Sequence, residues 1–174
     1  MDFITDLPKS DGYDTILVVI NRLTKMSHFI PCSKELDARQ FANLFMKEIV
    51  RLHGLPHDII TDRGTLFTSE LWKETTGKLG IERRLSRAFH PQTDRQTERT
   101  NAILEQYLRA YINYQQEDWC GYLPLAEFAC NSGYQEIIKK HSNLCELRNQ
   151  PRIRDDLSSD PRKAKQTGRQ DWIT

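Results

Sequence analysis

The residues HPQTDRQTER, at positions 90–99, lead from a polar loop into an amphipathic stretch and carry the acid Glu98. A second acid, Asp62, stands far upstream, where it follows the strand-like run 58–61 and precedes an Arg-Gly pair. This pattern is typical of an acid at the carboxyl end of a buried strand. Carboxylates so far apart in the chain meet at one site only when a folded sheet and a helix bring them together. Because clustered carboxylates select Mg²⁺ or Mn²⁺, the pair predicts a metal-dependent phosphoryl-transfer site.

Apolar runs and amphipathic stretches alternate along the rest of the chain. Strands are predicted at 14–21, 26–32, 58–62 and 81–85, the first two joined as an antiparallel hairpin. Helices are predicted at about 37–52, 69–79, 94–111 and 119–131. The sequence therefore predicts an α/β fold. Because sites in open α/β sheets gather at the carboxyl ends of strands, Asn21, Asp62 and Glu98 are expected to meet at one edge of a mixed sheet.

Composition sets broad limits on the class of protein. The 174 residues are 38% hydrophobic and 28% charged, which suits a soluble domain with a core that needs no disulfides. No apolar run approaches the roughly 18 residues of a membrane span, so no membrane partner is expected. The first residues carry acids where a secretory signal carries bases, and we expect an intracellular protein. The net charge of +1 neither favours nor excludes nucleic acid.

The cysteines and histidines do not predict a zinc site. The four cysteines are scattered, without a C-x-x-C pair or a histidine at zinc-finger spacing. We expect reduced, packing thiols, and loop hydrogen bonding for the histidines. Beyond residue 135 the apolar periodicity fades, and bases outnumber acids from 148 to 174. Residues 136–174 are therefore predicted to be a degenerate, basic, disordered tail that follows a core domain at 1–135.

Several blocks of residues carry a family resemblance. They are MDFIT (1–5), ILVVINRLTK (16–25), LHGLP (52–56), TDRG (61–64), FHPQTD (89–94), QTER (96–99) and LPLAEF (123–128). In this order they resemble the integrase catalytic core of gypsy-type long-terminal-repeat retrotransposons, within the retroviral-integrase-like superfamily. The resemblance implies a ribonuclease H-like fold, with a mixed sheet of about five strands flanked by helices. It also implies DNA integration by Mg²⁺-dependent strand transfer.

The resemblance gives Asp62 and Glu98 the second and third places of an acid triad that binds metal. It gives Asn21 the first place, where the family pattern has Asp, so Asn21 is predicted to be a degenerate ligand. Losing one ligand charge is expected to weaken Mg²⁺ or Mn²⁺ binding and to impair catalysis, by more than the roughly 10–100-fold typical of an altered second-layer partner. Arg95 stands where the family has Gly, a second sign of decay.

The resemblance also implies partners. Arg95, Gln96 and Arg99 lie where the family contacts DNA, although a solvated polar face explains them equally well. Element ends and target DNA are the expected partners, a homodimer is implied, and action on DNA places the protein in the nucleus. Two alternatives remain open: a non-catalytic nucleic-acid-binding or assembly module, and a relic without function.

Overall fold

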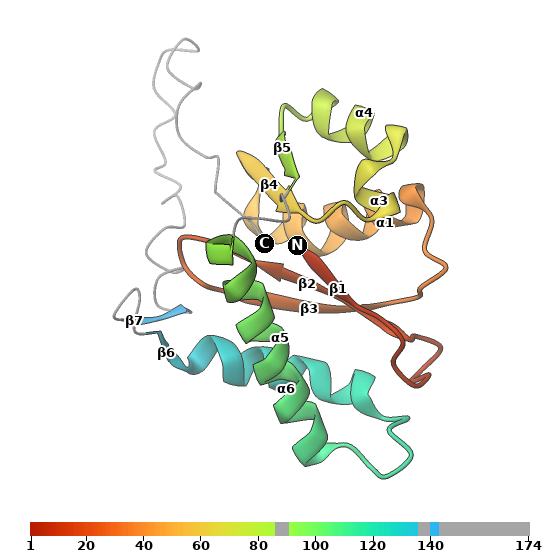
Figure 1. The fold of residues 1–174 in the computed structure, drawn as a ribbon, viewed down its shortest axis with the longest axis vertical. Coiled ribbons are helices and arrows are strands. Elements are labelled where there is room, and N and C mark those ends of the chain that lie inside the picture. Colours follow the sequence, from red (N-terminus) through yellow and green to blue (C-terminus); the bar gives the residue numbers. More distant parts are fainter. Residues whose placement is uncertain (86–90, 136–139, 143–174) are drawn as a thin grey trace, which may run out of the picture.

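The computed structural model describes residues 1–85, 91–135 and 140–142, with the backbone alone at 91–98, 134–135 and 140–141. The strands are β1 (Asp2–Ile4), β2 (Thr15–Ile20), β3 (Ser27–Cys32), β4 (Asp58–Thr61), β5 (Glu82–Leu85), β6 (Tyr134–Gln135) and β7 (Lys140–His141). The helices are α1 (Ala38–Phe45), the π-helical η1 (Met46–Val50), α2 (Arg51–His53), α3 (Thr65–Thr68), α4 (Glu70–Lys78), α5 (Pro91–Tyr111) and α6 (Trp119–Ser132). Figure 1 shows their arrangement, which confirms the predicted α/β class.

The strands of the central layer fall into two sheets. β1, β2 and β3 form an antiparallel sheet in that order, and β4 and β5 form a parallel pair. The Met1 amino group donates a hydrogen bond of 2.8 Å to the Ile60 carbonyl, which ties the start of β1 to β4. The expected strands are therefore present, but they are divided three and two rather than joined in one ladder.

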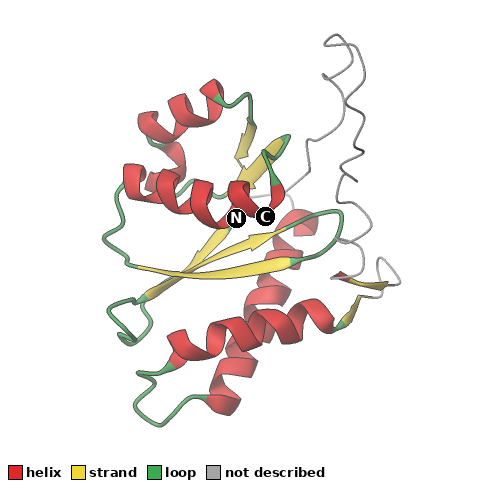
Figure 2. Cartoon of the chain, turned by 180° about the vertical axis from the view of Figure 1, so that it is seen from behind, coloured by secondary structure: helices red, strands yellow, loops and turns green. Residues whose placement is uncertain are grey.

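Both faces of β2 are covered, which explains why every residue of this strand is buried. Leu17 and Val19 pack with α1 and α4, in a core that includes Phe41. Ile16, Val18 and Ile20 pack against α5 and α6 instead. Figure 2 shows these two groups of helices on opposite sides of the strands. The continuous apolar run at 16–20, rather than a period of two, is what a strand between two helical layers requires.

Local signals place most helices as expected. Asp37 caps α1 in a capping box, because its side chain accepts from the Gln40 N–H while the Gln40 side chain accepts from Asp37. Ser69 caps α4 by accepting from Trp72. Four short elements are absent from the prediction: β1 and α3, with three and four residues, and β6 and β7, with two residues each. Elements this short carry no periodic signal.

The predicted boundary at residue 135 falls within a small antiparallel ladder. Tyr134 pairs with His141 and Gln135 with Lys140. Most of the predicted tail, 136–139 and 143–174, lies outside the described residues. Within the described part, no helix is long and apolar enough to cross a bilayer.

Candidate functional site

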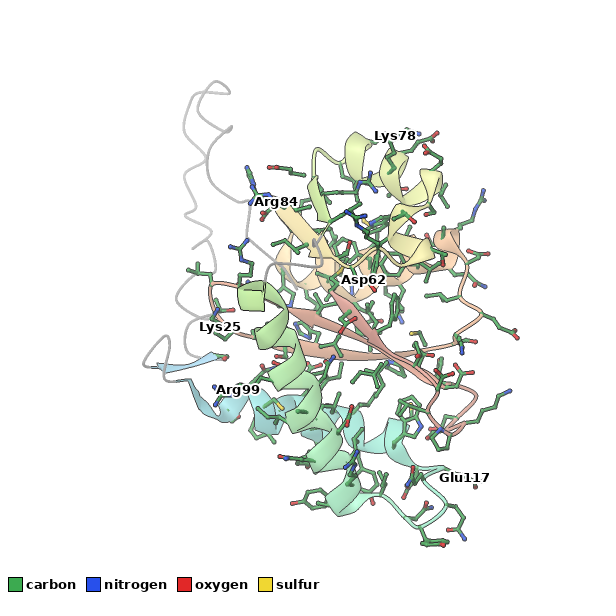
Figure 3. The ribbon with its side chains drawn as sticks, viewed as in Figure 1. Lys25, Asp62, Lys78, Arg84, Arg99 and Glu117 are labelled. Carbon is green, nitrogen blue, oxygen red and sulfur yellow. The ribbon has the colours of Figure 1, made fainter. Side chains whose placement is uncertain are left out.

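Asp62 lies directly after β4, in the link to α3, and its side chain is exposed (Figure 3). Its Oδ1 accepts a hydrogen bond of 3.0 Å from the Gly64 N–H, which fixes the carboxylate over the turn. A Cβ at Gly64 would lie 3.1 Å from the same oxygen. The turn therefore holds the Asp62 carboxylate at the carboxyl end of β4, as the sequence predicts.

Asp2 brings a second carboxylate to this place from β1. The hydrogen bond from Met1 to the Ile60 carbonyl sets Asp2 beside the end of the strand that leads to Asp62. Burial lowers the pKa of the Met1 amino group to about 5, while Asp2 and then Asp62 act in the opposite direction on it. Both carboxylates therefore lie near one amino group.

Helix α5 reaches the same place through Asn101. Its Nδ2 donates a hydrogen bond of 3.0 Å to Asp2 Oδ2. The Asn101 Oδ1 is buried and has no hydrogen-bond partner among the described residues. Glu98 lies on the same helix, about one turn before Asn101, although its side chain is outside the described part of the structure. Carboxylate and amide oxygens are the donors that Mg²⁺ and Mn²⁺ prefer, so this set fits the expected metal.

Asn21 lies elsewhere. Its side chain is buried, and its Oδ1 accepts from the Leu23 N–H at 2.9 Å and the Thr24 N–H at 3.1 Å. The next residue, Arg22, lies 3.8 Å from the carboxylate of Asp58, at the amino end of β4. Asp62 follows four residues later, about 13 Å away at roughly 3.3 Å per residue. The structure does not bring Asn21 and Asp62 together.

Strand direction explains this correction. β2 runs antiparallel to β1, with Asp2 opposite Val18. The carboxyl end of β2 therefore points toward the amino end of β4, and only parallel strands share a carboxyl edge. Asp2 is absent from the ligands predicted from sequence. The Asp-Phe-Ile block at the start of the family-like residues is the signal that could have indicated it.

The residues predicted to contact DNA are only partly visible. Arg99 is exposed on α5 (Figure 3), whereas the side chains of Arg95 and Gln96 lie outside the described part. Among the described side chains, no group of three or more His, Cys, Asp or Glu is placed to hold a metal ion. The described side chains do not include that of Glu98.

The fold matches that of solved integrases. The simian T-cell lymphotropic virus intasome, solved with the PP2A regulatory subunit B56 gamma, contains a chain with a TM-score of 0.69 and 18% identity, covering 92% of this chain and 57% of that one. The catalytic core domain of BIV integrase matches with a TM-score of 0.62 and 19% identity, over 84% of this chain and 93% of that one. The HTLV-2 integrase catalytic core in complex with magnesium matches with a TM-score of 0.62 and 18% identity, over 82% of this chain and 92% of that one. The chain therefore has the ribonuclease H-like fold of integrase catalytic cores.

The sequence is similar to transposon polyproteins. The Tf2-3 and Tf2-4 polyproteins of Schizosaccharomyces pombe are each 35% identical over 150 residues, which is 82% of this chain. The chain spans 11% of the length of either polyprotein. No protein-family profile matches it. In sequence and fold together, the chain matches the integrase catalytic core of a long-terminal-repeat retrotransposon, which confirms the predicted resemblance.

Proposed function

We propose that the chain is an integrase catalytic core that performs metal-dependent strand transfer on DNA phosphodiesters, with Asp2, Asp62 and Glu98 as the metal ligands. The observation that carries the proposal is the meeting of β1, β4 and α5. The Met1–Ile60 hydrogen bond joins the two strands, and the Asn101–Asp2 hydrogen bond joins the helix to them. The magnesium complex of the HTLV-2 core supports the choice of cation.

Hydrogen bonds orient two of the three proposed ligands. The Gly64 N–H orients the Asp62 carboxylate, and the Phe3 N–H and Asn101 amide orient that of Asp2. Bound divalent cations would activate the attacking hydroxyl and stabilise the charge on the leaving oxygen. The 3′ oxygen of the element strand forms a bond to a phosphorus of the target strand, as the bond between that phosphorus and its own 3′ oxygen breaks. A proton passes from the attacking hydroxyl to the leaving oxygen through solvent.

This choice of ligands changes the expected activity. The prediction of an impaired enzyme rests mainly on Asn21 as the first ligand. With Asp2 in that place, all three ligand positions are acids, and Asn21 is a buried turn residue. Arg95 still departs from the family pattern, which has Gly at this position. We therefore propose that this chain retains catalytic activity.

Activity on a labelled duplex that mimics an element end tests the proposal. The wild-type chain should process and transfer the strand in Mg²⁺ or Mn²⁺ but not in chelator. Asp2→Asn should lower the rate at least about 100-fold, because a ligand charge is lost. Asn21→Asp should give no gain, since residue 21 faces its own turn.

Two results would contradict this assignment. A large gain from Asn21→Asp, together with an unchanged rate for Asp2→Asn, would restore Asn21 as the degenerate ligand. DNA binding in chelator, combined with no strand cleavage once Mg²⁺ or Mn²⁺ is added, would favour the non-catalytic binding module.

Helix α6 carries exposed apolar side chains. Leu125 and Phe128 expose 52% and 65% of their surface on α6, an apolar area that suits contact with a second copy. The HTLV-2 core has been solved in dimeric and trimeric forms. We propose a homodimer that acts on element ends and target DNA, in the nucleus where that DNA lies.

A further inference from the structure

The amino end of β4 carries a polar pocket of about 480 Å³. Its lining residues come from the β2–β3 turn, the start of β4 and the end of β5: Arg22, Leu23, Lys25, His57, Asp58 and Arg84. Figure 3 shows Lys25 and Arg84 on the same side of the molecule. None of these residues belongs to the proposed metal ligands.

The β2–β3 turn is built to present its two cations. The Asn21 side chain caps the turn through the N–H groups of Leu23 and Thr24, and the Lys25 N–H donates to the Asn21 carbonyl at 2.8 Å. Lys25 adopts a φ of 62°, which is uncommon for a residue with a side chain. The turn therefore fixes Arg22 and Lys25 at the rim of the pocket, and the buried Asn21 gains a role distinct from metal binding.

Cations outnumber acids among the described residues that line this pocket. Asp58 is the one acid among them, and its carboxylate lies 3.1 Å from Arg84 and 3.8 Å from Arg22. Arg84 also pairs with Glu82 at 3.2 Å, outside the lining. Lys25 adds a third cation, and both burial and Arg22 lower the pKa of its ammonium group. Arg22 and Lys25 repel one another, and a phosphate bound beside them would offset that repulsion.

The pocket and the proposed metal ligands share one face of the sheet. Ile59 packs in the core beneath α1, so Asp58, its neighbour in β4, faces the α5 side. Asp2 also faces that side, because its partner Val18 packs against α5. Asp58 and Asp62 lie about 13 Å apart along β4. Because every nucleotide of a strand carries a phosphate, a strand bound at Asp62 would bring another of its backbone phosphates to this distance.

We infer that this pocket binds a backbone phosphate of the DNA strand whose scissile phosphodiester lies at Asp2 and Asp62. The inference rests on the proposed function, because it takes DNA as the substrate. It adds a specific contact, made by Arg22, Lys25 and Arg84, that positions the strand a few nucleotides from the metal ligands. Guanidinium groups suit this task because their donors match phosphate oxygens in pairs.

The salt dependence of DNA binding, measured in chelator, tests the pocket without catalysis. The double variant Arg22→Gln/Lys25→Asn removes two cations and leaves the Arg84–Asp58 pair in place. Asn tolerates a positive φ better than Lys does, so the turn should keep its fold, and circular dichroism would verify it. The plot of log affinity against log salt should become shallower by about one to two units, and affinity for duplex DNA should fall several-fold at low salt.

The matched control is Lys73→Gln/Lys78→Gln, which removes two exposed lysines of α4 that pair with glutamates of their own helix. It should leave the salt dependence close to that of the wild type. An unchanged slope in the pocket variant, an equal loss in the control, or a wild-type chain that does not bind DNA would each overturn the inference. A different result would contradict the proposed function: metal-dependent cleavage that is absent, or that is unchanged in Asp2→Asn.

Discussion

Gly64 touches the carboxylate that we assign to metal binding. Its own φ of −55° is available to any residue, so its value lies in the space it leaves beside Asp62. In Gly64→Ala, the new Cβ would meet Asp62 Oδ1 at 3.1 Å, and the carboxylate would have to shift by a few tenths of an ångström. We expect strand-transfer activity to fall roughly tenfold or more, because small displacements at a reacting centre are costly.

Gly77→Ala is the natural control for this change. Gly77 lies within α4, and a Cβ there meets nothing within 4 Å. Alanine should raise the free energy of unfolding by about 0.5–1 kcal/mol and leave activity unchanged. Thermal melting and strand-transfer rates of the two variants check the contrast. Equal activity in Gly64→Ala and the wild type would show that the Asp62 orientation does not matter.

Of the three residues Asp62, Asn21 and Asp2, only Asp62 could be placed correctly from the sequence. Asp62 was predictable because an Arg-Gly turn follows a strand-like run at that point. Asn21 has the same kind of sequence context, at the end of an apolar run, yet its oxygen is already bonded to two amides of its own turn. Asp2 sits in a three-residue strand with too little pattern to identify. Composition near a residue does not reveal which hydrogen bonds its side chain already makes.

At the scale of elements, the positions of the long helices and strands were predictable from the sequence. The relative directions of the strands were not. The capping residues Asp37 and Ser69 set the starts of α1 and α4 as expected. Whether a strand runs parallel or antiparallel to its neighbour depends on pairing across the sheet, which a single run of residues does not encode. The antiparallel β1–β2 pairing places Asn21 at the end of the sheet opposite Asp62, which is why we propose Asp2 rather than Asn21 as the first ligand.

The end of β3 offers a test of how α1 closes the core. Cys32 is 2% exposed there, and burial raises the pKa of its thiol to about 12. The folded state therefore favours the protonated thiol. This contribution to stability is complete below the ordinary value near 9 and is lost as the pH rises toward 12. Since the thiolate is the reactive form, we expect Cys32 to resist alkylation at pH 8.

Mass-spectrometric mapping of alkylated peptides would measure this protection. In denaturant, Cys32 should react at the rate of an ordinary thiol. A Cys32→Ala variant should lose the part of the stability decrease above pH 9 that the thiol causes. Labelling of native Cys32 as fast as in denaturant would show that α1 does not seal this end of the sheet.

At the scale of the whole molecule, two helical layers around one strand layer place two kinds of charge on the same face. The carboxylates of Asp2 and Asp62 lie where β1, β4 and α5 meet, and the cationic pocket lies at the other end of β4. The match to retroviral integrase cores describes the fold, while the proposed ligands rest on the hydrogen bonds of this chain's own residues. The basic face would hold the strand, and the acids would act on it.

A crystal of the protein soaked in Mn²⁺ tests the central claim most directly, because manganese is located by its anomalous scattering. We expect an ion bound by carboxylate oxygens of Asp2 and Asp62 at about 2.0–2.2 Å, with Asn21 still bonded to its own turn. An ion bound to the side-chain oxygen of Asn21, with none at Asp2, would contradict the account.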